Sequence, residues 1–339
     1  MSTRVSVRDV ARAAGVSIGS VSRVLNDSGY ASAALRKAVL DAVTRLGYEP
    51  DHTARQLRTG HTRAVGYLLP DISNPAMAMH LSAVERLLRE AGYSLLIGSS
   101  ETPARDQELL RYFENHRLEG VIALPVAEYP DPSTCPFTAC GLPIVLVDRE
   151  LGHPFDSVLV DHRLGIGQAV EYLVTLGHQR IALFASSVAT RPGREKLAGY
   201  REALDRAGLA FDEALVYLPD QWLESPRERM SAILQLSRPP TALISIGTHM
   251  LSAAVRVARE RGLDIPRDLS VIGIGTTEML ELMYPPVTSL RYSFERSSQA
   301  CVRLMLERIS GAAAGPAQQV MVYPELVMGG SCARPRCAA

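Results

Sequence analysis

Apolar and polar positions follow two different patterns along the chain, and the change comes near residue 63. Up to that point apolar residues recur three and four positions apart, which is typical of amphipathic helices. Beyond it, short aliphatic runs alternate with amphipathic helical stretches. The expected strands are 64–70, 93–100, 120–125, 144–148, 157–161, 180–186, 241–247 and 270–275, and the expected helices are 77–92, 106–116, 194–208, 249–262 and 294–311.

Strands that alternate with helices predict parallel sheets covered by helices on both faces. The alternation starts again after residue 165, so we expect an α/β fold with two doubly wound parallel lobes behind a helical N-terminal head. Sheets of this kind bind ligands beyond the carboxyl ends of their strands, which predicts a cleft between the lobes.

The head should contain three short helices. A Ser-x-x-Asp capping box at Ser6 opens the first helix and Gly15 ends it, while Ser17 caps the second. Ser32 caps a third helix, which Gly47 ends. Two helices joined by a three-residue turn with a glycine indicate a helix-turn-helix. A small helical bundle without a ligand would give the same apolar pattern.

The second helix has an unusual outer face. Val21, Val24 and Leu25 share one side, and the other carries a bare glycine, one arginine and several hydroxyls. Hydroxyl and guanidinium groups are suited to phosphate and base contacts. The outward residues are Ser17, Gly19, Ser20, Ser22 and Arg23.

Charge is distributed unevenly, although the net charge of the 339 residues is zero. Residues 1–63 hold ten basic and five acidic side chains, so the net charge of this head is +5 and that of the remaining residues is −5. This asymmetry is typical of a nucleic-acid reader attached to a body with another task. It favours double-stranded DNA as a partner of the head.

Composition excludes several other classes. No run of 18 apolar residues is present and charges occupy the N-terminus, so we expect a cytoplasmic, nucleoid-associated protein without a membrane span or signal peptide. Five cysteines fit a reducing compartment, and Cys135/Cys140 and Cys332/Cys337 have no histidine near them, so no metal is expected. Neither a P-loop nor an H-E-x-x-H motif occurs. An enzyme would therefore rest on the fold alone, and no cofactor is expected. A solute receptor would need an export signal.

Several strings together carry a family resemblance. "DVARAAGVS…SVSRVLN" followed by "GYEPDHTARQLRTG" resembles the opening of the lac/galactose repressor (LacI) family, and "GLPIVLVDRE", "GHQRIALF", "KLAGYREAL" and "GLDIPRDLSVIGIG" extend the likeness to about Leu326. The resemblance implies a periplasmic-binding-protein-like core behind the helix-turn-helix. It implies a DNA-binding domain at 1–50, a hinge helix at 51–62 and a core at 63–339, with one lobe at about 63–162 and 293–322 and the other at about 163–290 and 323–339.

The resemblance also implies roles in DNA binding. The family places its second helix in the major groove, where Ile18, Gly19 and Arg23 would face base edges. Phosphate contacts would come from Ser17, Ser20 and Ser22. In the hinge, Arg55 would contact DNA and Leu57 would wedge into the central base step. Two copies would bind a near-palindromic operator as a homodimer, and the tail lacks the leucine heptads of a tetramer-forming coiled coil.

The family's effector contacts map onto strand ends and helix starts of the core. They fall on Met77, Arg149, Asp161, Arg191, Arg194, Lys196, Trp222, Thr248 and Gly275. Trp222 either stacks on a ligand or is buried. The family usually has aspartates where this chain has Thr248 and Gly275, so a more positive cleft and an anionic sugar derivative as effector are expected. Alternatives are a cleft that binds no small molecule and control by a protein partner.

Overall fold

The structure of the protein is a computed structural model that describes residues 5–25, 30–48, 61–219, 225–275 and 278–336. It divides into two compact units, residues 1–62 and 63–339. Residues 55, 57 and 222, to which the sequence assigns contacts, lie outside the described residues. No helix in the described part of the chain is long and apolar enough to span a bilayer.

Within residues 5–25 and 30–48, the described part of the first unit, three helices surround a small apolar core: α1 (Val7–Ala14), α2 (Ile18–Leu25) and α3 (Ala33–Leu46). The capping box at Ser6 forms, with Asp9 accepting a hydrogen bond from the Ser6 backbone. Gly15 and Gly47 end α1 and α3 with φ angles of 65° and 59°, a left-handed conformation that glycine adopts at little cost. The three helices pack on Val10, Ala11, Val21, Val24, Val39 and Ala42.

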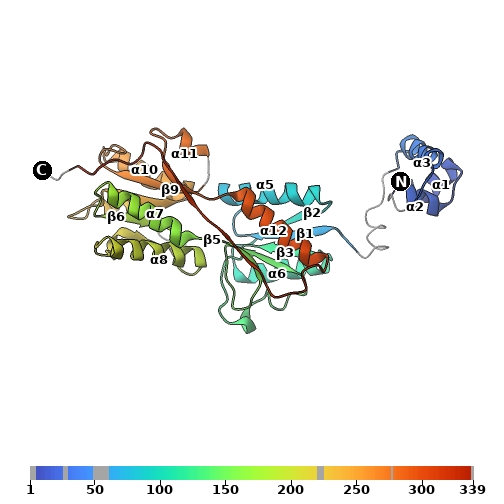
Figure 1. Ribbon diagram of the computed structural model, residues 1–339, viewed down its shortest axis with the longest axis horizontal. Coiled ribbons are helices and arrows are strands. Elements are labelled where there is room, and N and C mark those ends of the chain that lie inside the picture. Colours follow the sequence, from blue (N-terminus) through green and yellow to red (C-terminus); the bar gives the residue numbers. More distant parts are fainter. Residues whose placement is uncertain (1–4, 26–29, 49–60, 220–224, 276–277, 337–339) are drawn as a thin grey trace. The chain divides into compact units, whose positions relative to one another are not determined.

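The second unit contains two six-stranded sheets, each in its own lobe (Figure 1). The N-lobe sheet has the order β11-β5-β4-β3-β1-β2, and every pairing within it is parallel. Its strands are β1 (Ala64–Leu69), β2 (Ser94–Ser99), β3 (Gly120–Ala123), β4 (Ile144–Val147), β5 (Asp156–Val160) and β11 (Gln319–Val322). Its helices are α5 (Pro75–Glu90), α6 (Pro103–Asn115), α12 (Phe294–Ile309) and the 3-10 turn Pro132–Thr134.

The C-lobe sheet has the order β12-β10-β9-β8-β6-β7 and is parallel except for β12, which runs antiparallel to β10. Its strands are β6 (Ile181–Phe184), β7 (Val216–Tyr217), β8 (Ala242–Ile246), β9 (Ser270–Ile274), β10 (Thr288–Arg291) and β12 (Glu325–Val327). Its helices are α7 (His162–Thr175), α8 (Arg191–Arg206), α9 (Pro226–Ile233), α10 (Thr248–Glu260), α11 (Glu278–Leu282) and the 3-10 turn Glu213–Leu215.

The chain passes between the lobes three times: from β5 into α7, from β10 into α12, and from β11 into β12. Helix α12 therefore returns to the N-lobe, where it lies along α5 (Figure 1). Strands β3, β4, β5 and β6 are buried at every position, as strands with helices on both faces should be. The carboxyl ends of β3 and β4 and the N-terminus of α8 meet where the lobes touch.

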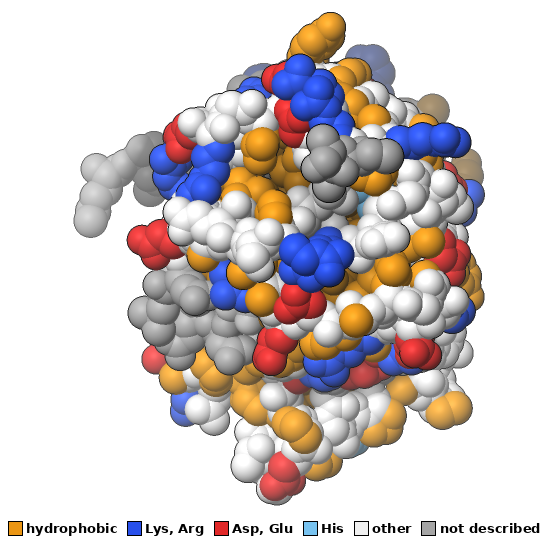
Figure 2. Space-filling view, turned by 90° about the vertical axis from the view of Figure 1, so that its left-hand side faces the viewer, with side chains coloured by type: hydrophobic (Ala, Val, Ile, Leu, Met, Phe, Trp, Pro, Cys, Tyr) orange, Lys and Arg blue, Asp and Glu red, His pale blue; other side chains and the backbone are white. Residues whose placement is uncertain are grey.

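The surface at the C-lobe end mixes both signs of charge (Figure 2). Ion pairs of the C-lobe join Arg227 to Glu260 and both Arg267 and Arg336 to Asp268.

Candidate DNA interface and interlobe site

Helix α2 is anchored by its apolar side and leaves the predicted contact residues outside. Val21 and Val24 are buried in the core of the first unit, whereas Ile18 is 47% exposed and Arg23 is exposed. Gly19 is exposed as well, and a Cβ built on it would come no closer to another atom than 3.7 Å. Packing within the chain therefore does not require a glycine at this position.

The serines of α2 differ in how far they are already engaged. Ser17 Oγ accepts a hydrogen bond from the Ser20 backbone at 3.1 Å and lies 3.0 Å from Ser20 Oγ, so Ser17 caps the helix.

The string GVSIG at 15–19 matches the spacing of a hydrolase nucleophile motif. That motif needs a strand before its serine, and here α1 precedes it, so a nucleophile elbow is not formed.

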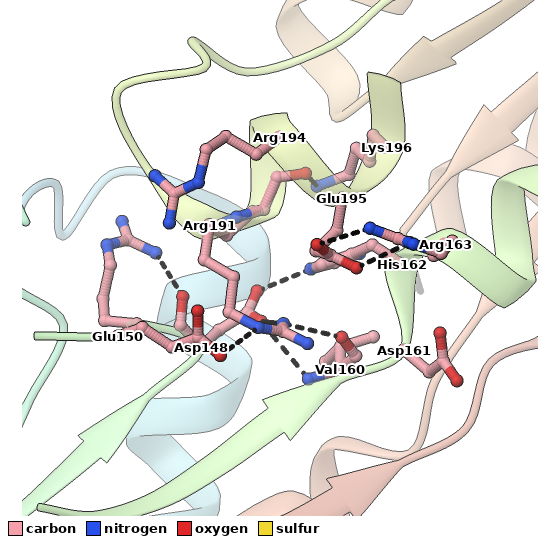
Figure 3. A network of polar contacts seen from close by, with 12 residues as sticks. Asp148, Glu150, Val160, Asp161, His162, Arg163, Arg191, Arg194, Glu195 and Lys196 are labelled. Atoms are coloured by element: carbon pink, nitrogen blue, oxygen red, sulfur yellow. Dashed lines mark hydrogen bonds and ion pairs between the residues drawn. The ribbon is translucent and has the colours of Figure 1, made fainter. Parts of the chain in front are cut away.

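Four of the predicted effector residues lie where α8 meets the carboxyl ends of the N-lobe strands: Arg149, Arg191, Arg194 and Lys196. Figure 3 shows the three that belong to α8. The other predicted residues that the structure describes belong to other elements. Asp161 caps α7 by accepting a hydrogen bond from Leu164 N at 2.9 Å. Met77 packs against the N-lobe core, and Gly275 follows β9 with a φ of 130°. Thr248 is the first residue of α10.

Arg191 is bound on three sides by the N-lobe. Its Nε donates to Glu150 Oε1 at 3.2 Å, and its Nη1 donates to the carbonyl oxygen of Val160 at 2.9 Å. Nη1 also reaches Asp148 Oδ1 at 3.4 Å. Its side chain is only 7% exposed. The guanidinium of this C-lobe residue is therefore held almost entirely by atoms of the N-lobe (Figure 3).

Glu128, in the loop after β3, also accepts hydrogen bonds from the start of α8. Its Oε1 accepts from the backbone N–H of Arg191 at 2.9 Å and from that of Glu150 at 3.0 Å. Its Oε2 accepts from Arg194 Nη2 at 2.6 Å. The N-terminus of a helix favours negative charge because its first N–H groups lack partners within the helix.

Asp148 connects both lobes at the end of β4. Its Oδ2 lies 2.7 Å from His162 Nε2 and its Oδ1 accepts from the backbone of Val160. Burial raises the pKa of Asp148, but the charge interaction and hydrogen bond with His162 and the charges of Lys196 and Arg149 outweigh it and hold the pKa well below its usual range. We therefore assign the shared proton to His162. The φ of 53° at Asp148 is uncommon for a residue other than glycine, and its hydrogen bonds keep it there.

Arg149 and Lys196 complete the set of cations. Arg149 donates from Nε to the carbonyl oxygen of Pro125 and from Nη1 to its neighbour's carbonyl, both at 2.9 Å. Lys196 Nζ donates to the carbonyl oxygen of Pro192 at 3.3 Å. Burial, with the Arg149 and Arg191 charges, lowers the pKa of Lys196 to about 8 despite the opposing charge of Asp148.

A small cavity of about 10 Å³ lies beside Lys196, where the three lobe crossings meet. Such a volume holds a single water molecule. Its lining includes His162, Lys196, Ile274, Tyr292 and Pro324. Arg149, Arg191 and Lys196 are buried among protein atoms, whereas the Arg194 side chain is 44% exposed.

The expected excess of positive charge needs correction. The replacement of two aspartates by Thr248 and Gly275 predicts a more positive cleft. In the structure, however, three carboxylates, those of Glu128, Asp148 and Glu150, lie among the four cations. Asp148 could have been noticed, because it directly follows an aliphatic run. Glu128 stands in a loop after a proline and carries no motif.

Comparison with known proteins gives matches over both units. Residues 6–51 match the bacterial regulatory proteins of the lacI family, and residues 170–332 match a periplasmic binding protein-like domain. The HTH-type transcriptional regulator CelR of Thermobifida fusca is 32% identical over 326 residues, which cover 94% of this chain and 96% of that protein.

Two solved structures are similar over nearly the whole chain. The lac repressor dimer bound to operator and the anti-inducer ONPF is 26% identical, with a TM-score of 0.86 over 98% of this chain and 100% of that one. A complex of the transcriptional regulator CelR with cellobiose is 30% identical, with a TM-score of 0.73 over 97% of this chain and 100% of that one.

Proposed function

The chain belongs to the lacI family of bacterial regulatory proteins, and on that premise we propose how its two units divide the work of a DNA-binding transcriptional regulator. The first unit reads DNA and the second binds a small effector. The protein acts in the cytoplasm, on the nucleoid, as a homodimer on near-palindromic operators. It is a regulator and not an enzyme.

The exposed face of α2 carries the DNA-binding proposal. Val21 and Val24 fix the helix on its own core, so Ile18, Gly19 and Arg23 are free to enter a major groove while Ser17 and Ser20 approach phosphates. Arg23 can donate two hydrogen bonds to one guanine, and Ile18 can pack on a thymine methyl group. Arg55 and Leu57 add hinge contacts by sequence likeness alone.

The interlobe site carries the effector proposal. Arg149, Arg191, Arg194 and Lys196 lie at strand ends and at the start of α8, where doubly wound sheets bind ligands. For the effector we propose a sugar derivative with an acidic group, such as a sugar acid or a phosphorylated sugar. Lys196 supports this choice, since its ammonium group donates only to a carbonyl oxygen among the described contacts.

Selection of bound DNA from a random pool tests the regulator. The full-length protein should enrich a near-palindromic sequence, and the binding should weaken steeply with salt, since log K falls by about 0.9 for each phosphate neutralised as log salt rises. Failure to bind any duplex at low ionic strength would refute the proposal.

Calorimetric titration with matched sugars tests the effector class. The neutral sugars are glucose and cellobiose, and their acidic derivatives are glucuronate, glucose 6-phosphate and the aldonic acid of cellobiose. Comparing each neutral sugar with its derivatives distinguishes recognition of the acidic group from recognition of the sugar ring. Heat from the acidic members supports the proposal. Heat from neutral sugars alone would replace it with a neutral effector.

A further inference from the structure

The two lobes are joined by side chains of the protein itself. Glu128, Asp148 and Glu150 of the N-lobe hold Arg191 and Arg194 at the start of α8 in the C-lobe, and we call these five residues the lobe clasp. They come from the loops after β3 and β4 and from the first turn of α8, so these contacts cross from one lobe to the other. Figure 3 shows the contacts of Arg191 with Asp148 and Glu150.

The lobe clasp differs from the ion pairs on the surface of the core. The side chain of Glu128 is 5% exposed and that of Arg191 is 7% exposed. By contrast, Glu171 and Arg206, which pair between α7 and α8 within the C-lobe, are each 56% exposed. A buried charge that loses its partner remains without solvent, so breaking one contact of the clasp is costly, whereas the surface pair contributes little.

Glu128 is the residue on which the clasp depends. Its two oxygens accept from Arg191 N and Arg194 Nη2 in the C-lobe and from Glu150 N in its own lobe. The start of α8 packs closely on the loop before it, since a Cβ at Gly193 would collide with the backbone carbonyls of that loop. Loss of the carboxylate would therefore remove the Glu128 contacts to the start of α8 and loosen the clasp, while the Arg191 guanidinium keeps its own partners in the N-lobe.

We propose that Glu128 is an internal ligand that keeps the lobes together until an effector arrives. Its carboxylate occupies the cationic start of α8, so an acidic group on an effector would compete with it for Arg191 and Arg194. This inference rests on the proposed function of the interlobe site. The Glu128 carboxylate would thus regulate the binding of an effector to the interlobe site.

The contact can be tested on the full-length protein without effector or DNA. Glu128→Gln keeps the size of the side chain and removes its charge, and Arg194→Gln removes the partner from a half-exposed position. Hydrogen exchange read by mass spectrometry would follow peptides spanning 187–194 and 148–152, and X-ray scattering would follow the radius of gyration. Glu171→Gln, which breaks the surface pair, is the matched control.

Both clasp variants should exchange on the order of tenfold faster in these two peptides, as expected when a charged hydrogen bond is lost, and should show a larger radius of gyration. The double variant should resemble the single ones, because both act on one contact. Glu171→Gln should match the wild type. Unchanged exchange and scattering in both Glu128→Gln and Arg194→Gln would overturn the proposal.

DNA selection on the same samples separates the two ideas. If the clasp variants open while no form of the protein binds a duplex, the proposed function fails and the lobe clasp stands. If DNA is bound but the lobes are unaffected by either substitution, the clasp fails and the regulator stands.

Discussion

His80 shows how one buried side chain can link three elements of the N-lobe. Its Nδ1 lies 2.6 Å from the Tyr67 hydroxyl and its Nε2 lies 3.1 Å from Ser297 Oγ. We assign the proton of the neutral imidazole to Nε2, so that the Tyr67 hydroxyl donates to Nδ1 and Nε2 donates to Ser297. Strand β1 and helices α5 and α12 are thus joined through a neutral imidazole.

Protonation of His80 should destabilise the protein in mild acid. Burial lowers its pKa from 6.5 to about 4, while the charge of Asp148 opposes this. The unfolded chain therefore binds the proton first, and stability is lost as the pH falls from 6.5 toward 4, by at most about 1.4 kcal/mol per unit. Urea unfolding of His80→Gln at several pH values should show a shallower loss than the wild type. Parallel curves would contradict this.

Arg23 should determine a base preference rather than overall affinity. Removal of its guanidinium in Arg23→Ala should cost roughly 1–3 kcal/mol at one base pair of each half-site and leave that position degenerate. Arg12→Ala, which removes an exposed arginine from α1, should leave the preference intact. Binding to a library with each operator position randomised measures both. An equal loss on random DNA from Arg23→Ala would show a phosphate contact instead.

The position of a residue on a strand or helix can be predicted from the local sequence pattern. A contact between residues far apart in the sequence cannot. The strand-end position of Arg149 and the positions of Arg194 and Lys196 in the first turn of an expected helix were predictable from pattern and resemblance, whereas the helix was expected to begin after Arg191. That Glu128 would meet them was not readable, because 63 residues separate it from Arg191 and only the folded lobes bring the two together.

Helices α7 and α8 pack closely because glycines line part of their contact. A Cβ at Gly199 would collide with the backbone of Arg163, whereas one at Gly167 would lie 3.4 Å from the end of the flexible Arg206 side chain. Gly199→Ala should therefore cost about 1–3 kcal/mol of stability. Gly167→Ala should be neutral or stabilising by up to about 1 kcal/mol, since alanine favours helix. The denaturation midpoints of Gly199→Ala and Gly167→Ala measure the two effects. Equal changes in stability would mean that helices α7 and α8 can move apart to accommodate the added methyl group.

Element boundaries reflect caps that the apolar pattern alone does not mark. Apolar periodicity predicted helices from residues 77, 106 and 194, yet α5 begins at Pro75, α6 at Pro103 and α8 at Arg191. Asn74 and Thr102 accept hydrogen bonds from the first turns of α5 and α6, and a proline occupies the first turn in all three helices. The two-residue strand β7 is too short to give a periodic signal.

At the scale of the molecule, the change of pattern near residue 63 coincides with the division into two units, each with a core of its own. A fragment of residues 61–339 should therefore fold alone and keep the melting transition of the core, because its sheets and helices bury their apolar faces within it. It should lose operator binding, since α2 is removed. Calorimetry and mobility shift measure the two properties on one preparation. An unfolded fragment would show that the core depends on the head, and a fragment that still selects the operator would move the DNA interface out of the first unit.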